Sequence, residues 1–390
     1  MQSLRKNMPN SKRREKNEAF RCLYGFGVLF ILLSHCGGGG VSFLNNWVNF
    51  GAFHVAVFLF GSGYFFSDED LLSPGKWFAK KLKKLILPLF LWNVFYGIII
   101  VILKHFGFFA DVRTDAFYFL ISPVSSDSLF LFDLAAWFVF PFFMVQVIWF
   151  LLLLLIKAVF KDGYKKMMIA EALLFIASGC AGILICNAGY RSDILLPVFR
   201  ILYFCPFYAA GYLLSVVDIT KKERVIPYLC IPALIISLLL NSYFGRSVYA
   251  IPSSCDYPFG LLATYLSAFC GIMLWLSISY MMTENGKKTT ALCKPITFLA
   301  DNGFYIMMHQ FAGFFILNVF YLIISRMFNA FSDFDVSAFK TDIWYMYIPK
   351  GIEEYKFLYV LFGTGFSVLL GFVTKKIRMI GSAQTKQTDK

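Results

Sequence analysis

The chain has 390 residues, of which 59% are hydrophobic and only 15% are charged, whereas a typical soluble domain carries about 25% charged residues. The formal charge of +13 does not indicate nucleic-acid binding, because the basic residues form short clusters between apolar runs. The nine cysteines include no C-x-x-C pair, and there are only four histidines. Neither a disulfide framework nor a metal site is therefore expected.

Apolar runs long enough to cross a bilayer, which takes about 20 helical residues, recur along the whole chain. They predict an all-α fold: a polytopic integral membrane helical bundle of about ten transmembrane helices. The first two runs are short. The ninth is long and contains Gly303 and Gly313, either of which could interrupt its helix. In chain order the predicted spans are 20–36, 50–66, 85–103, 134–156, 167–186, 194–217, 225–240, 258–282, 295–322 and 357–374.

Three regions follow from these spans. A basic tail over 1–19 is expected to be retained, because no small-residue cleavage site of the signal-peptide kind follows it. Residues 20–374 form the transmembrane domain, and residues 375–390 form a second tail.

The distribution of lysine and arginine predicts the orientation of the chain. With the N-terminus in the cytoplasm, 27 of the 36 basic residues fall in cytoplasmic segments and nine on the opposite side. Cytoplasmic loops of membrane proteins carry this excess, so we expect both termini in the cytoplasm of a multi-pass cell-membrane protein. The longest outer segments are 104–133, which ends in Asp133, and 323–356; long loops are often functional.

Ionisable groups inside the spans are the first candidates for chemistry, because burying them in a membrane is costly. His35 and Arg21 stand at opposite ends of the first span, about 21 Å apart along a helix and on one face of it. This spacing fits a buried base above a cation at the cytoplasmic mouth. The alternative is an interfacial histidine with a snorkelling arginine.

The other histidines differ in their surroundings. His54 is expected at the membrane interface and His105 in solvent. Asp301, Tyr305 and His309 recur every fourth residue, which predicts a polar stripe on an apolar helix that faces the bundle interior. Such a stripe could equally be a hydrogen-bonded packing motif between helices.

The run KWFAKKLKKLILPLF leads into the third span and contains Lys81 and Lys84 among its five lysines. Positive-inside anchoring explains such a cluster without a ligand. The functional alternative is a binding surface for an anionic cytoplasmic substrate such as a nucleotide phosphate.

Taken in order, these segments resemble the membrane acyltransferase 3 family, which includes many polysaccharide O-acetyltransferases. RCLYGFGVLFILLSH is similar to the family's first helix, with arginine and histidine at its ends. HVAVFLFGSGYFFS resembles its second-helix signature, with the Ser-Gly pair at Ser62 and Gly63. KKLKKLILPLFLW resembles its basic entry to helix three, AAWFVFPFFMV resembles its W-F segment at Trp137, and YFCPFYAAGYLL and GFYIMMHQF resemble later segments.

The resemblance departs from the family pattern at three places. The family's arginine lies eleven residues before its histidine, where Tyr24 stands here, and Arg21 lies nearly one turn further back. Lys81 and Lys84 replace the arginines of helix three. The tyrosine before His309 is four residues back rather than three.

The resemblance implies an O-acyltransferase that moves an acyl group, acetyl first of all, from cytoplasmic acyl-CoA to a hydroxyl of a surface glycan. It implies catalysis by His35 as general base or as transient acyl carrier. Acyl-CoA is a co-substrate, and no bound cofactor is expected. The implied donor-phosphate ligands are Arg21, Lys81 and Lys84. The implied cavity-lining residues are Tyr24, Ser62, Trp137, Tyr305 and His309.

A rival interpretation of the same features is a non-catalytic transporter or flippase for a surface polysaccharide or a lipid-linked precursor. Ten spans, polar groups inside the membrane and long outer loops fit a carrier as well. The sequence contains no visible inverted repeat, which favours the enzyme.

Overall fold

The computed structural model describes residues 17–36, 47–125, 130–159, 164–216, 223–347 and 349–388. Over these residues the fold is all-α, and the only extended pairing is an isolated bridge between Ile251 and Asp256. Nine helical stretches in this described part are long and apolar enough to cross a membrane. The predicted membrane helical bundle is confirmed, while most of the predicted basic tail, residues 1–16, lies outside the described residues.

The helices of the first half are α2 (Glu18–His35), α3 (Ala56–Tyr64), α4 (Pro74–Lys81), α5 (Leu87–His105), α6 (Ala116–Leu120), α7 (Ser122–Ser125), α8 (Val139–Val159) and α9 (Tyr164–Asn187). A π-helical turn, η4 (Leu82–Ile86), joins α4 to α5 without a break. The short 3-10 segments are η2 (Phe50–Ala52), η3 (Asp68–Leu72) and η5 (Leu131–Phe138).

The second half contains α10 (Leu196–Val216), α12 (Cys230–Phe244), α13 (Gly260–Met282), α14 (Lys294–Phe328), α15 (Val336–Thr341), α16 (Ile343–Tyr347) and α17 (Lys356–Thr388). Its 3-10 segments are η6 (Ile226–Leu229), η7 (Ala291–Cys293) and η8 (Glu353–Tyr355). The long α14 runs through both Gly303 and Gly313, so neither glycine interrupts the ninth predicted span.

The second predicted span, 50–66, is helical over only nine residues of α3. The segment nevertheless runs antiparallel to α2. The ring of Phe53 lies 5.8 Å from that of Phe30, and the ring of Tyr64 lies 4.1 Å from that of Phe20. Three glycines in and beside this helix, and a 3-10 turn before it, account for its short helical length.

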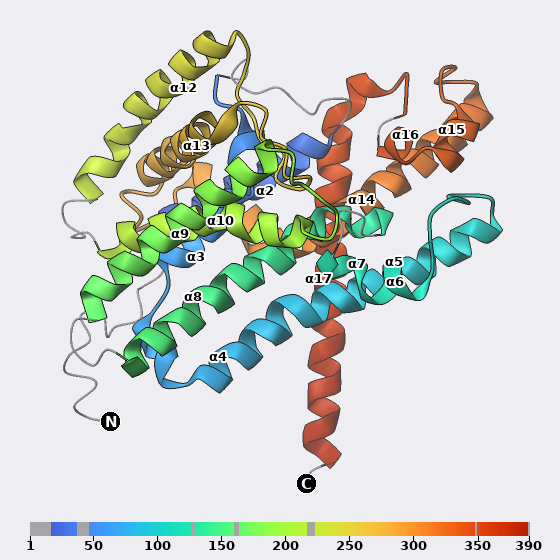
Figure 1. Cartoon of the computed structure of the whole chain (residues 1–390). Helices are drawn as coiled ribbons and strands as arrows, with labels where there is room; N and C mark the ends of the chain where they lie inside the picture. Colours follow the sequence, from blue (N-terminus) through green and yellow to red (C-terminus); the bar gives the residue numbers. More distant parts are fainter. Residues whose placement is uncertain are drawn as a thin grey trace.

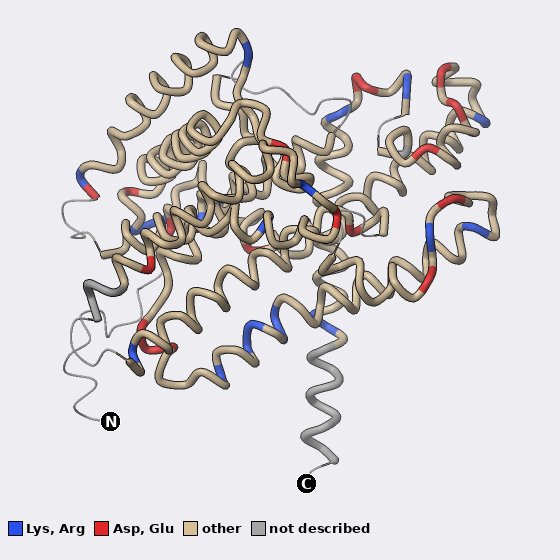
Figure 2. The backbone as a smooth tube through the Cα atoms, viewed as in Figure 1, with Lys and Arg blue, Asp and Glu red and all other residues tan. Residues whose placement is uncertain are grey.

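The burial pattern is that of a bundle in lipid. Helices α2, α10 and α13 are the most buried of the long helices and lie in the middle of the bundle (Figure 1). Outward-facing apolar side chains such as Leu91, Leu151, Leu239 and Phe372 keep more than half of their surface exposed. In water this would be a large aggregation-prone surface, whereas hydrocarbon solvates it without cost. Figure 2 shows the charged residues gathered at helix ends and loops and along α4.

Glycine allows α3 and α10 to approach at backbone contact. A Cβ atom on Gly211 would lie 1.8 Å from the carbonyl oxygen of Phe60, and one on Gly63 would lie 2.0 Å from that of Tyr208. Small residues at helix crossings permit this approach in membrane bundles, where van der Waals contact drives packing. The Ser-Gly pair therefore fixes α3, and with it Ser62, against the bundle core.

Gly211→Ala is expected to destabilise the protein by about 1–3 kcal/mol, because the new methyl group meets backbone rather than a flexible side chain. The measurement is the thermal midpoint of the purified chain in detergent. Gly365→Ala in α17 is the matched control, because a Cβ there meets nothing within 4 Å. Equal midpoints for the two variants would show that α3 and α10 do not pack as described.

Candidate active site

A pocket of about 360 Å³ lies between α2, α3, α4, α8 and α10. Four residues that the sequence singles out line it together: Tyr24, Ser62, Lys81 and Lys84. We name it the lysine pocket. The remainder of its wall is largely aromatic and consists of Phe58, Phe65, Phe66, Asp70, Trp77, Leu85, Phe142, Gln146 and Tyr208.

Gln146 organises the polar side of the lysine pocket. Its Oε1 accepts hydrogen bonds from Ser62 Oγ, at 2.9 Å, and from Lys81 Nζ. Its Nε2 donates to the carbonyl oxygen of Phe142 one turn back, at 2.9 Å, which fixes the direction of the amide. Gln146 was not among the residues predicted from the sequence, although a lone amide in the apolar helix that follows Trp137 is a detectable signal.

Lys81 and Lys84 share one face because they lie three residues apart on the helix that runs from α4 through η4. Lys81 is half-buried, and its ammonium lies 5.6 Å from the ring centroid of Trp77. Lys84 is exposed. Asp70 contributes a carboxylate to the same pocket, so a ligand meets two cations and one anion there.

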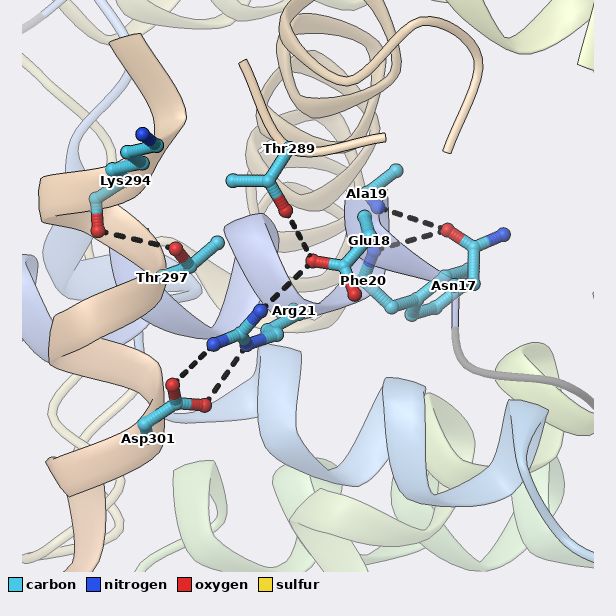
Figure 3. Close-up of polar contacts among 9 residues, drawn as sticks. All are labelled: Asn17, Glu18, Ala19, Phe20, Arg21, Thr289, Lys294, Thr297 and Asp301. Atoms are coloured by element: carbon cyan, nitrogen blue, oxygen red, sulfur yellow. Dashed lines mark hydrogen bonds and ion pairs between the residues drawn. The ribbon is translucent and has the colours of Figure 1, made fainter. Parts of the chain in front are cut away.

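Arg21 lies at the start of α2 but does not line the lysine pocket. Its guanidinium makes a two-pronged pair with Asp301 of α14 and donates from Nη1 to Glu18 at 3.0 Å (Figure 3). Glu18 also accepts from Thr289 Oγ1 at 2.6 Å. Arg21 therefore joins α2 to α14, and a phosphate would have to displace a carboxylate to reach it.

His35 occupies the last residue of α2 and is half-buried. Its Nδ1 lies 3.2 Å from Oε1 of Gln310, a fully buried residue of α14, and its ring centroid lies 4.8 Å from that of Phe311. An amide oxygen only accepts hydrogen bonds, so this contact places the ring proton on Nδ1. The lone pair on Nε2 is then available to take a proton.

One face of α2 connects the lysine pocket with His35. Tyr24 lines the pocket, and His35 follows eleven residues later. Eleven residues of α-helix turn through three turns plus about 20° and rise about 16 Å, so both side chains lie on the same face. Val28 and Ile31, which lie between them on this face, are buried, so a ligand arm that follows α2 to the imidazole would have to displace packed side chains.

Three other predicted cavity-lining residues lie outside the lysine pocket. Trp137 stacks against the guanidinium of Arg200 at 5.1 Å, and Tyr305 lies under Lys375 Nζ at 5.4 Å. His309 is fully buried, with Nδ1 2.7 Å from the hydroxyl of Tyr96. The three residues of the polar stripe on α14 thus contact three different helices: Asp301 contacts α2, Tyr305 contacts α17 and His309 contacts α5.

Within the described residues, no three His, Cys, Asp or Glu side chains gather as metal ligands would.

Comparison with known proteins yields one match, at the level of a family. The sequence profile of the acyltransferase 3 family, described as an acyltransferase domain, matches residues 17–376. No curated protein and no solved structure matches the chain at a significant level. The match covers nearly the whole chain, from the first turn of α2 into α17. The chain therefore belongs to the acyltransferase 3 family and is a multi-pass membrane acyltransferase.

Proposed function

We propose that the protein transfers an acyl group, acetyl first of all, from cytoplasmic acyl-CoA to a hydroxyl group of a surface glycan in the cell membrane. The observation that carries the proposal is the alignment of the lysine pocket and His35 on one face of α2. A coenzyme A thioester has anionic phosphates at one end and the reacting carbonyl at the other. It needs a cationic site for the phosphates and a base near the carbonyl, and the two must be well separated.

The donor would bind with its phosphates at Lys81 and Lys84. Ammonium groups hold phosphate oxygens by charge-assisted hydrogen bonds. Gln146 and Ser62 supply an amide and a hydroxyl next to these lysines, which suit the polar groups of the pantetheine arm. The positive-inside bias of the sequence supports a cytoplasmic position for this end of the bundle, where the donor is made. Arg21 joins the phosphate site only if Asp301 releases it.

The reaction itself takes place at His35. As general base, Nε2 accepts the proton of the acceptor hydroxyl while that oxygen attacks the thioester carbonyl. The carbon–sulfur bond breaks, an ester bond forms, and the proton passes to the departing thiolate of coenzyme A. In the alternative route, Nε2 attacks the carbonyl first, the carbon–sulfur bond breaks, and the thiolate of coenzyme A leaves. The acceptor hydroxyl then attacks the acyl-imidazole, the acyl–nitrogen bond breaks, and the proton of the hydroxyl passes to the thiolate.

The proposal is tested with membranes that contain the chain and acetyl-CoA labelled in the acetyl group. We expect the label to appear in base-labile esters on envelope glycans, and inside-out vesicles to consume acetyl-CoA added from outside. Right-side-out vesicles are expected to leave that acetyl-CoA untouched. Movement of glycan across the membrane without any transfer of label would refute the proposal in favour of the carrier.

A further inference from the structure

A second group of polar side chains lies buried between α5, η5 and α14, away from the lysine pocket. It consists of Asn93 and Tyr96 on α5, Asp133 in η5 and His309 on α14, and we name it the buried polar cluster. None of the four is more than 2% exposed. From the sequence, Asp133 is expected at the end of the long outer segment 104–133, outside the membrane spans. The structure corrects this, because η5 packs the residue into the bundle.

The buried polar cluster holds more hydrogen-bonding capacity than its own members use. Both carboxylate oxygens of Asp133, Nε2 of His309 and Oδ1 of Asn93 are buried and lack a hydrogen-bond partner among the described residues. The contacts that do form are those of Tyr96 with His309 Nδ1 and of Asn93 Nδ2 with the carbonyl oxygens of Tyr118 and Phe119, both at 2.9 Å.

These unpaired atoms are costly for the fold. A buried polar group without a partner costs roughly 1–3 kcal/mol, and a carboxylate costs more. Most buried polar atoms in proteins are paired, and the exceptions are concentrated at functional sites. Asp133 differs from the isolated Glu171 because unpaired atoms of His309 and Asn93 lie in the same cluster, and such a group of atoms can together receive the hydroxyls of a molecule from outside the chain.

The buried polar cluster is connected with His35 through two routes. His309 and Gln310 are adjacent on α14, and Gln310 holds the imidazole of His35. On the second route, the ring of Tyr347 lies 4.4 Å from that of Phe311, which in turn contacts His35. The hydroxyl of Tyr347 donates to the carbonyl oxygen of Leu131 at 3.1 Å, which ties this route to η5, two residues before Asp133.

The chemistry of the cluster suits a hydroxylated ring. A carboxylate accepts hydrogen bonds from hydroxyl groups, and a neutral imidazole nitrogen pairs with another. Aromatic rings beside them offer apolar faces: Trp92 lies 4.3 Å from the His309 ring, and Phe132 lies 5.5 Å from Tyr96. We propose that Asp133 and His309 form the subsite that holds the sugar acceptor next to His35. This inference rests on the proposed acyl transfer.

Entry of the acceptor requires η5 to move away from α14, because the cluster is closed to the surface. The backbone of Asp133 is non-helical, at φ −118° and ψ 18°, and divides η5 into two parts. This break lets the first part of η5 move while α8 stays in place, since the hydrogen-bond ladder is already interrupted there.

Asp133→Asn tests the subsite, because asparagine keeps the shape of aspartate and removes its charge. Acylation of envelope glycans, measured as base-labile acyl groups on cells that depend on the chain, is expected to fall at least about tenfold. The thermal midpoint in detergent is expected to stay equal or rise, because a binding group without a structural partner is unfavourable for folding. The increase in midpoint caused by added coenzyme A is expected to be unchanged.

Glu171→Gln on α9 is the matched control, since Glu171 is also a buried carboxylate whose two oxygens have no partner in the described part of the chain. It is expected to keep acylation at the wild-type level. Full acylation by Asp133→Asn, or a lowered midpoint that reveals a structural role, would overturn the subsite. If the wild-type chain itself adds no acyl groups, the proposed function fails before the variants are compared.

Discussion

Replacing His35 with alanine is expected to abolish acyl transfer while the chain remains folded in the membrane. The imidazole either takes the acceptor's proton or carries the acyl group, and loss of a general base alone costs roughly 10²–10⁴-fold in rate. The change removes the contacts with Gln310 and Phe311 at a half-buried helix end, so the bundle is expected to stay folded. The measurement is the rate of acetyl transfer at saturating acetyl-CoA, together with the thermal midpoint.

His105→Ala is the matched control for this prediction. His105 ends α5 as His35 ends α2, but it is exposed and contacts only the carbonyl oxygen of Val101, at 3.0 Å. It is expected to transfer acetyl groups at the wild-type rate. Wild-type turnover by His35→Ala would show that the imidazole takes no part in the chemistry. Labelled acetyl bound to wild-type protein, but not to the His35 variant, would select the acyl-carrier route over the general base.

Replacing Lys81 and Lys84 together with glutamine is expected to raise the KM for acetyl-CoA, with a smaller effect on kcat. A hydrogen bond to a charged group contributes about 1.5–3 kcal/mol, so the loss of two such contacts should raise KM at least tenfold. Phosphate binding far from the thioester supplies affinity rather than transition-state stabilisation, which is why kcat should change less. The measurement is initial rate against acetyl-CoA concentration, at fixed ionic strength.

Two control variants accompany the double replacement of Lys81 and Lys84 with glutamine. Lys288→Gln changes an exposed lysine in the loop after α13 and is expected to leave KM unaltered. The double replacement of Lys81 and Lys84 with arginine is expected to keep or lower KM, because guanidinium groups bind phosphate in a two-pronged manner. An unchanged KM in the double glutamine variant would mean that the coenzyme's phosphates bind elsewhere.

The helical bundle could be predicted from the sequence, because each membrane helix is determined by the apolar residues of its own segment. Long apolar runs must be helical in lipid, where every backbone amide needs an internal partner. Nine of the ten predicted spans correspond to the long apolar helices of the described residues. The second predicted span, 50–66, does not form a full-length helix, because glycines at 51, 61 and 63 weaken helix propensity while allowing close packing.

The partners of the polar residues could not be predicted, because they depend on contacts between distant parts of the chain. From the sequence, Arg21 was expected to bind phosphate. In the structure its guanidinium pairs with Asp301, which lies 280 residues away in the sequence. Gln146 and Gln310 carry no charge, so a search for ionisable groups passes over them. Asp133 lies just outside an apolar run, and only the packing of η5 on α14 shows that it is buried.

Acyl transfer as proposed requires a coenzyme A thioester to lie along α2 from the lysine pocket to His35. An experimental structure of the chain with a non-reactive thioether analogue of acetyl-CoA would show its position. We expect phosphate density in contact with Lys81 and Lys84, an arm that passes Tyr24, and the sulfur within reach of His35 Nε2. An analogue bound outside the lysine pocket, or an arm that ends away from the imidazole, would contradict the proposal.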